Sequence, residues 1–94
     1  MSRFTTRVEL HRADENDYER LHEEMAAEGF ERTITDDKGN TFHLPPAEYN
    51  WVGNEDDQHV ILRKAKEAAT RTGRRHEILV TKSAGRTWDN LTPA

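Results

Sequence analysis

Residues 3–11 alternate between two kinds of side chain, and this alternation restricts the fold more than any other feature of the sequence. Four of these residues fall on one face: Phe4, Thr6, Val8 and Leu10. The residues between them are polar, and most of them are charged. A period of two over this stretch predicts a strand that is buried on one face and exposed on the other.

The residues after this strand predict a helix. Asp14 can act as its N-cap, and the acidic residues that follow suit the positive end of a helix. Tyr18, Leu21 and Met25 come next at helical spacing and form one apolar stripe. Gly29 is placed to end the helix, because glycine readily adopts the left-handed conformation found at such ends.

Two further extended stretches, Phe30–Thr35 and Thr41–Leu44, flank a cluster of turn-forming residues at 36–40. Short extended stretches on either side of such a cluster predict a hairpin. The second stretch runs into Pro45 and Pro46, which have no N–H to donate to a neighbouring strand. We therefore expect a bulge or bend at the two prolines, with strand pairing resumed over residues 48–52.

The second half of the chain predicts one more helix and one more strand. Either Asp56 or Asp57 caps the helix, and Gly73 ends it. The buried stripe of the helix consists of Ile61, Ala65, Ala68 and Ala69. The extended stretch His76–Lys82 predicts the last strand.

The order of these elements is βαββαβ. It predicts an α+β domain, a ferredoxin-like sandwich with a four-stranded antiparallel sheet and two helices on one face. In that arrangement the first strand is central and lies between the third strand and the last, with right-handed crossovers. We expect residues 1–83 to form this single domain. Residues 84–94 form a C-terminal tail that is too polar to add an element, and Trp88 can attach it.

Apolar residues are few for a chain of 94 residues, with 33% hydrophobic and 34% charged. A core this thin gains stability from a partner subunit, so we expect a homodimer. The absence of cysteine excludes disulfides and thiolate zinc sites and fits the cytoplasm. The alternating N-terminus is unlike a signal peptide, and the longest apolar run, Val60–Leu62, is too short to span a membrane. We therefore expect a cytoplasmic protein with no membrane contact.

The net charge of −4 is divided unevenly along the chain. Residues 1–13 carry +2, residues 14–57 carry −11 from 14 acidic and 3 basic residues, and residues 58–94 carry +5. Such a division predicts a basic surface for nucleic acid and an acidic surface elsewhere. The alternative is that the charged residues only solvate the outer faces of the helices. The predicted sheet order would place Arg3 and Arg7 beside the last strand.

No standard catalytic motif is present, and no two of the five histidines have the i,i+4 spacing that holds a metal on one helix. We therefore expect neither a metal site nor a cofactor. RNA-recognition motifs share the predicted order of elements, but they stack bases on aromatic residues of the exposed sheet face. The outward residues of the first strand are Thr5, Arg7 and Glu9, which excludes that mode of RNA binding.

His11 and Arg12, at the end of the first strand, suit RNA chemistry. A histidine can move a proton near neutral pH, and an arginine can hold a phosphate through a bidentate fork. Cleavage through the RNA 2′-hydroxyl needs both functions. Arg7, Arg32 and His43 can lie on nearby strands. The alternative is that all five are ordinary exposed residues at strand ends.

Four stretches resemble a family of small bacterial and phage-borne proteins: RFTTRVELH at 3–11, DYERLHEEMAAEGFERTI at 17–34, TFHLPPAEYN at 41–50 and SAGRTW at 83–88. That family is similar to the GhoS-type antitoxins of type V toxin–antitoxin systems. Those antitoxins are ferredoxin-like endoribonucleases that cut the messenger RNA of the toxin. Their fold resembles that of the CRISPR-associated endoribonucleases that work as dimers.

The resemblance implies an endoribonuclease or an RNA-binding antitoxin that acts on single-stranded RNA. It places Arg20 and His22 where the antitoxins have two basic residues around a leucine. The catalytic candidates are then His11, His22 and His43, and the candidates for RNA binding are Arg7, Arg12, Arg20 and Arg32.

A competing hypothesis is a non-catalytic homodimeric module that binds another protein. The net negative charge, the acidic first helix and the lack of an active-site motif favour this second function.

Overall fold

Five strands and two helices make up the computed structural model, which describes residues 1–94. The elements are β1 (Ser2–Leu10), α1 (Glu15–Ala27), β2 (Thr33–Thr35), β3 (Thr41–His43), β4 (Glu48–Gly53), α2 (Gln58–Arg71) and β5 (His76–Lys82). The chain is therefore of the α+β class, as the sequence predicts. Neither helix is long and apolar enough to cross a membrane.

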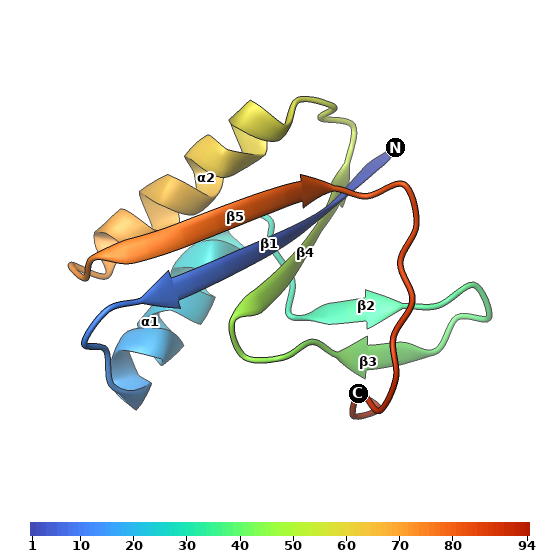
Figure 1. Ribbon diagram of the computed structural model, residues 1–94, viewed down its shortest axis with the longest axis horizontal. Coiled ribbons are helices and arrows are strands. Elements are labelled where there is room, and N and C mark those ends of the chain that lie inside the picture. Colours follow the sequence, from blue (N-terminus) through green and yellow to red (C-terminus); the bar gives the residue numbers. More distant parts are fainter.

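β1 is the central strand of the main sheet, which has the order β4-β1-β5 and is antiparallel throughout (Figure 1). Thr6 on β1 pairs with Tyr49 on one side and with Val80 on the other. This central position confirms the prediction for the first strand. The prediction of one four-stranded sheet is wrong, because β2 and β3 pair with each other in a separate two-stranded sheet.

The two prolines explain this division of the strands. Because neither proline can donate to a ladder, β3 ends at His43 and the chain turns before β4 begins. The turn is closed by a hydrogen bond of 2.9 Å from the N–H of Glu48 to the C=O of Pro45, which confirms the predicted bend. The hairpin stays linked to the main sheet through Glu31, whose N–H and C=O each form a hydrogen bond of 2.7 Å with Asn50.

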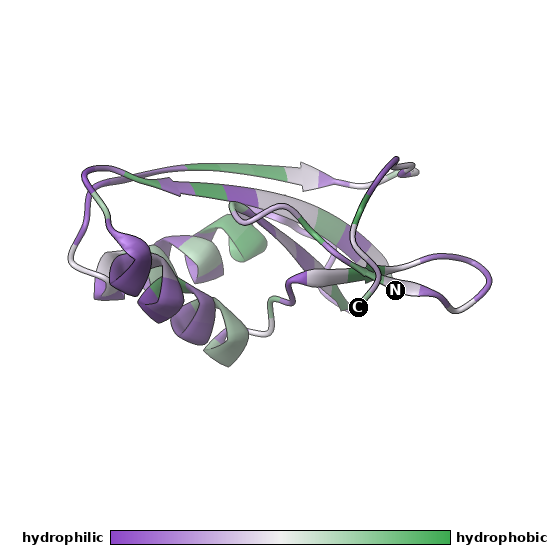
Figure 2. Ribbon diagram, turned by 90° about the horizontal axis from the view of Figure 1, so that it is seen from below, coloured by the Kyte–Doolittle hydropathy of each residue, from purple (hydrophilic) through white to green (hydrophobic).

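Both helices lie on the same face of the main sheet (Figure 2). Phe4, Val8 and Leu10 point toward them from β1 and are buried, as the period-two alternation predicts. The small side chains of α2 let it approach the sheet closely. The helical residues that complete the core are Leu21 and Met25 on α1 and Ile61, Ala65, Ala68 and Ala69 on α2.

Each helix begins at an aspartate. Asp14 accepts the N–H of Asp17 at 2.9 Å, and the Asp17 carboxylate accepts the N–H of Asp14 at 3.0 Å, which is a capping box. Asp57 caps α2 by accepting the N–H of His59 at 2.8 Å. The predicted N-cap of α1 is confirmed. Of the two candidates for the N-cap of α2, Asp56 and Asp57, the structure shows Asp57. Gly29 has a φ of +92°, the left-handed conformation that follows many helix ends.

The C-terminal tail, residues 84–94, crosses from the end of β5 to the β2–β3 hairpin (Figure 1). The N–H of His43 donates to the C=O of Thr92 at 2.8 Å. The ring of Trp88 lies edge-on to Phe42, with the ring centres 5.7 Å apart. Trp88 therefore attaches the tail to the hairpin, as predicted, and the tail contains no helix or strand of its own.

Candidate nucleic-acid interface

His11 and Arg12 follow the last residue of β1 and meet the residues that precede β5. Because the two strands are antiparallel, the end of β1 lies beside the start of β5. The N–H of His11 donates to the C=O of Arg75 at 2.7 Å. This pairing brings together two basic dipeptides, His11-Arg12 and Arg74-Arg75, that lie far apart in the sequence.

The two dipeptides surround a surface cavity of about 470 Å³. Its lining consists of His11, Arg12, Gly73, Arg74 and Arg75. We refer to these residues as the strand-end cluster. Its side chains are basic apart from the glycine, and none is acidic or apolar.

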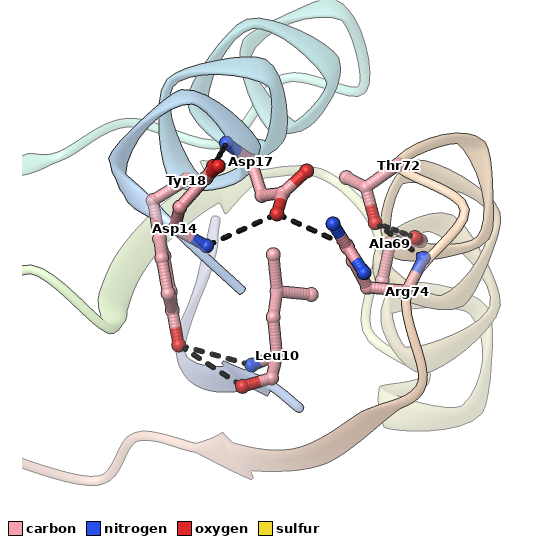
Figure 3. Close-up of polar contacts among 7 residues, drawn as sticks. All are labelled: Leu10, Asp14, Asp17, Tyr18, Ala69, Thr72 and Arg74. Atoms are coloured by element: carbon pink, nitrogen blue, oxygen red, sulfur yellow. Dashed lines mark hydrogen bonds and ion pairs between the residues drawn. The ribbon is translucent and has the colours of Figure 1, made fainter. Parts of the chain in front are cut away.

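Hydrogen bonds from α1 and from Thr72, the residue that follows α2, hold the backbone around the strand-end cluster (Figure 3). The hydroxyl of Tyr18 on α1 accepts the N–H of Leu10, the last residue of β1, at 3.1 Å. The hydroxyl of Thr72 donates to a carbonyl of the last turn of α2. The cluster is therefore formed where β1 ends, α1 begins and α2 ends.

Arg74 is the one guanidinium of the cluster that has an acidic partner. Its Nε donates to Oδ2 of Asp17 at 3.0 Å (Figure 3). The hydrogen bond from the N–H of Asp14 lowers the pKa of the Asp17 carboxyl, and Arg74 lowers it further. Asp17 is therefore ionised at neutral pH and offsets the charge of Arg74.

Arg12 and Arg75 have no carboxylate within ion-pair distance. His11 lies at the edge of the cluster, with its Nε2 3.6 Å from Oε1 of the exposed Glu77. The cluster thus carries two guanidinium groups whose charge the protein does not offset. Such groups bind oxyanions, because a guanidinium presents paired N–H donors to two oxygens of one phosphate.

His22 and Arg32 lie near each other at a different place, where the side chain of His22 on α1 contacts Tyr49 on β4. The Nδ1 of His22 is 2.5 Å from the hydroxyl of Tyr49. Burial lowers the pKa of His22, and the charge of Arg32 lowers it further. Burial also raises the pKa of the Tyr49 hydroxyl. His22 is therefore neutral at pH 7 and links the helix to the sheet.

The other predicted site residues are dispersed. His43 is exposed on β3. Arg7 lies on the open face of the main sheet, with its Nη2 2.6 Å from Oε1 of Glu9. Arg20 is an exposed residue of α1 whose Nε lies 3.8 Å from Oε2 of Glu24. Of the site residues predicted from the sequence, only His11 and Arg12 belong to the strand-end cluster.

Arg74 and Arg75 are not among the site residues predicted from the sequence, although the strand register could have identified them. His76, the first residue of β5, pairs with Leu10, the last residue of β1. The residues just before β5 must therefore lie beside those just after β1. The sequence pattern identified His11 and Arg12 at the end of β1, but the charge division drew Arg3 and Arg7, rather than Arg74 and Arg75, into the predicted basic surface.

Neither a scan against protein-family models nor a search of curated proteins found a match to this chain. The resemblance carried by the four sequence stretches stays a prediction. The arrangement of the strand-end cluster is thus the observation from which a function can be inferred.

Proposed function

We propose that this domain binds single-stranded RNA through the strand-end cluster, as the resemblance to the GhoS-type antitoxins implies. The observation that supports the proposal is a cavity lined by basic side chains in which Arg12 and Arg75 lack an acidic partner. The phosphodiester groups of RNA supply the missing negative charge. Charge-assisted hydrogen bonds from a guanidinium to a phosphate are among the stronger polar contacts of proteins.

The extent of the cluster favours a single strand over a duplex. Domains that bind double-stranded RNA contact it over roughly 16 base pairs. The basic residues here gather at one strand end, around a cavity of about 470 Å³. A site of this extent reaches one or two phosphates of a flexible strand.

The arrangement of the elements supports a ferredoxin-like fold within this proposal. β1 lies between β4 and β5, and both helices lie on one face. Glu31 bridges to Asn50 at the outer edge of β4, where a ferredoxin-like sheet has its second strand. The β2–β3 hairpin is then an elaboration of the link between that edge and β4.

RNA cleavage at this site depends on His11, the one predicted catalytic histidine in the cluster. A neutral imidazole there accepts the proton of the RNA 2′-hydroxyl while the 2′-oxygen forms a bond to phosphorus. The bond from phosphorus to the 5′-oxygen breaks, and solvent protonates that leaving oxygen. Arg12 and Arg75 offset the charge that develops on the phosphate oxygens. Binding is the primary proposal, and cleavage by His11 is its catalytic extension.

Fluorescence anisotropy with a labelled single-stranded RNA, measured over a series of salt concentrations, tests the binding. The double variant Arg12→Gln/Arg75→Gln should bind more weakly. Its slope of log affinity against log salt should be shallower by roughly 1.4, since each phosphate contact on a single strand contributes about 0.7. The variant Arg63→Gln/Lys66→Gln removes the same charge from the exposed surface of α2 and should bind like the wild type.

Binding that does not depend on salt, or equal losses in the two double variants, would contradict the proposal. The catalytic extension is tested by incubating the same RNA with the wild type and with His11→Ala, with and without a chelator. Cleavage that survives the chelator and is lost in His11→Ala, with binding kept, supports the role of His11. Intact RNA in both samples removes the catalytic extension.

A second candidate function, a non-catalytic homodimeric module that binds another protein, is favoured by β5. This strand is an edge of the main sheet, and Leu79 at its centre is 64% exposed. Antiparallel pairing of two β5 strands would continue the sheet and bring the two Leu79 side chains together. Light scattering should then show a dimer that Leu79→Lys converts to a monomer, and a monomeric wild type contradicts this function.

A further inference from the structure

A larger cavity lies at the opposite end of β1 from the strand-end cluster. It has a volume of about 880 Å³ and is bordered by the first residues of β1, residues of β4, the end of β5, the β2–β3 hairpin and the C-terminal tail. The tail passes from the end of β5 to the β2–β3 hairpin (Figure 1), and its residues 84–88 line this cavity. We call it the tail cleft. Its lining is mostly polar, and it includes two arginines from opposite ends of the chain, Arg3 and Arg86.

Arg86 is held in place by neutral acceptors. Its Nη1 donates to Oδ1 of Asn50 at 2.7 Å and to Oγ1 of Thr5 at 3.3 Å. Asn50 is only 6% exposed, and its backbone is fixed by the pair of hydrogen bonds to Glu31. A guanidinium has five N–H donors. Those on Nε and Nη2 of Arg86 have no partner in the protein, and this edge of the group is suited to bidentate binding of an oxyanion.

The two arginines of the tail cleft have no ion-pair partner, because no carboxylate lies within ion-pair distance of Arg86 or of Arg3. Burial lowers the pKa of Arg86, and the charge of Arg3 lowers it further. Lys82, a third cation on the lining, is paired with Asp56 at 3.0 Å. The two arginines therefore repel each other unless an anion lies between them.

Carboxylates line the cleft on the hairpin side. Asp36 is occupied by its own turn, where it accepts the N–H groups of Asn40 at 2.8 Å and Lys38 at 3.0 Å. Glu31 and Asp37 are exposed. These groups would repel a second anion, and they can accept hydrogen bonds from hydroxyl groups. The lining thus suits a ligand with one anionic end and a neutral, hydroxyl-bearing body.

We propose that the tail cleft binds a phosphomonoester that carries hydroxyl groups, such as a sugar phosphate. Nε and Nη2 of Arg86 hold two phosphate oxygens, and Arg3 offsets the second negative charge of the phosphate. The phosphomonoester can come from a free small molecule or from the 5′-phosphate of an RNA strand. The site does not rest on RNA binding at the strand-end cluster, because no residue lines both cavities.

Isothermal titration calorimetry with four probes tests the tail cleft. The small probes are ribose 5-phosphate and unphosphorylated ribose. The other two are a short single-stranded RNA with a 5′-phosphate and the same strand with a 5′-hydroxyl. Arg86→Lys keeps the charge and removes the fork, so it should weaken phosphomonoester binding by about tenfold or more. Arg3→Gln should weaken it by a smaller factor, and Arg63→Gln on α2 is the matched control.

Ribose 5-phosphate that binds when ribose does not, with weaker binding in Arg86→Lys, supports a free phosphomonoester. A preference for the 5′-phosphorylated RNA that Arg86→Lys removes supports an RNA end as the source. Should Arg86→Lys fail to fold by circular dichroism, Arg3→Gln decides, since the exposed Arg3 makes no side-chain hydrogen bond.

The proposal is overturned if neither probe pair shows binding that depends on the phosphate. It is also overturned if phosphate-dependent binding is unchanged in Arg86→Lys and in Arg3→Gln. The variant Arg12→Gln/Arg75→Gln separates the two sites. It should lose RNA affinity and keep the affinity for ribose 5-phosphate.

Discussion

Arg12 adopts a backbone conformation that most side chains avoid. Its φ is +52°, in the left-handed region, where a residue with a Cβ costs roughly 1–2 kcal/mol. A glycine at this position would relieve that cost, yet the chain has an arginine that lines the strand-end cluster. Strained backbone of this kind concentrates at binding and catalytic sites. The guanidinium of Arg12, rather than its backbone, is what the position provides.

The variant Arg12→Gly should therefore be as stable as the wild type or more stable, by up to about 1 kcal/mol, because glycine adopts a positive φ without strain. The same variant should bind single-stranded RNA more weakly. Thermal unfolding and anisotropy measured on one sample check both effects. A clear loss of stability would show that Arg12 serves the fold and not the site.

His22 should make the stability of the domain depend on pH. Its pKa is lower in the folded state than the ordinary value of 6.5, so the unfolded state binds more protons as the pH falls below 6.5. The stability that neutral His22 contributes is complete above pH 6.5 and is lost below it. Asp17 acts at lower pH, because its pKa is lowered from 3.8.

Urea unfolding of the wild type and of His22→Gln checks this dependence at about pH 7.5 and about pH 5. The wild type should lose more free energy of unfolding between the two values than the variant does. If the free energies of unfolding of the wild type and the variant differ by the same amount at both pH values, the proposed role of His22 is contradicted.

The elements that the sequence predicts well are those that a local pattern determines. The alternation of β1 and the Asp14 cap of α1 act within a few residues, and both are found in the structure. The separation of the β2–β3 hairpin from the main sheet could not be predicted in the same way. Pro45 and Pro46 indicate an interruption, but they do not say which strand β2 then pairs with.

The strand-end cluster was predictable only in part, for a related reason. His11 and Arg12 are visible as residues that end a strand, whereas Arg74 and Arg75 join them through the register of β5 on β1. The register between two strands that lie far apart in the sequence cannot be read from either strand alone. A shift of one residue would move every inward side chain of the strand to the other face, so the packing of the complete sheet sets the register.

The end of β4 offers a test of how tightly this sheet is packed. A Cβ on Gly53 would lie 2.6 Å from Cη2 of Trp51, whose ring is edge-on to Phe4 at 5.9 Å. Gly53→Ala must therefore displace a confined ring and should lower the free energy of unfolding by about 1–3 kcal/mol. Gly85→Ala, where a Cβ meets nothing within 4 Å, is the matched control and should change it by about 0.5 kcal/mol at most. Equal effects in denaturant unfolding would contradict this packing.

The charged side chains are distributed over the folded molecule differently from the way they are distributed along the chain. Residues 58–94 carry +5, but contacts with the acidic middle of the chain offset part of this excess. Arg71 of α2 pairs with Glu24 of α1 and with Glu28, the residue that follows α1, and these ion pairs join the two helices. Arg74 and Lys82 also have acidic partners. The charge division predicts a basic surface, whereas in the fold the arginines without an ion-pair partner are Arg12 and Arg75 in the strand-end cluster, Arg3 and Arg86 in the tail cleft, and Arg32 and Arg63 elsewhere.

The most direct test of RNA binding at the strand-end cluster is a titration followed by the backbone amide signals of the ¹⁵N-labelled protein. A single-stranded RNA with a 5′-hydroxyl avoids a contribution from the tail cleft. We expect saturable shifts at residues 11–12 and 73–75 that shrink as salt is added, with little change at Arg86. Saturable binding whose shifts lie on the open face of the sheet or along β5, with none at the strand-end cluster, would contradict the proposed site.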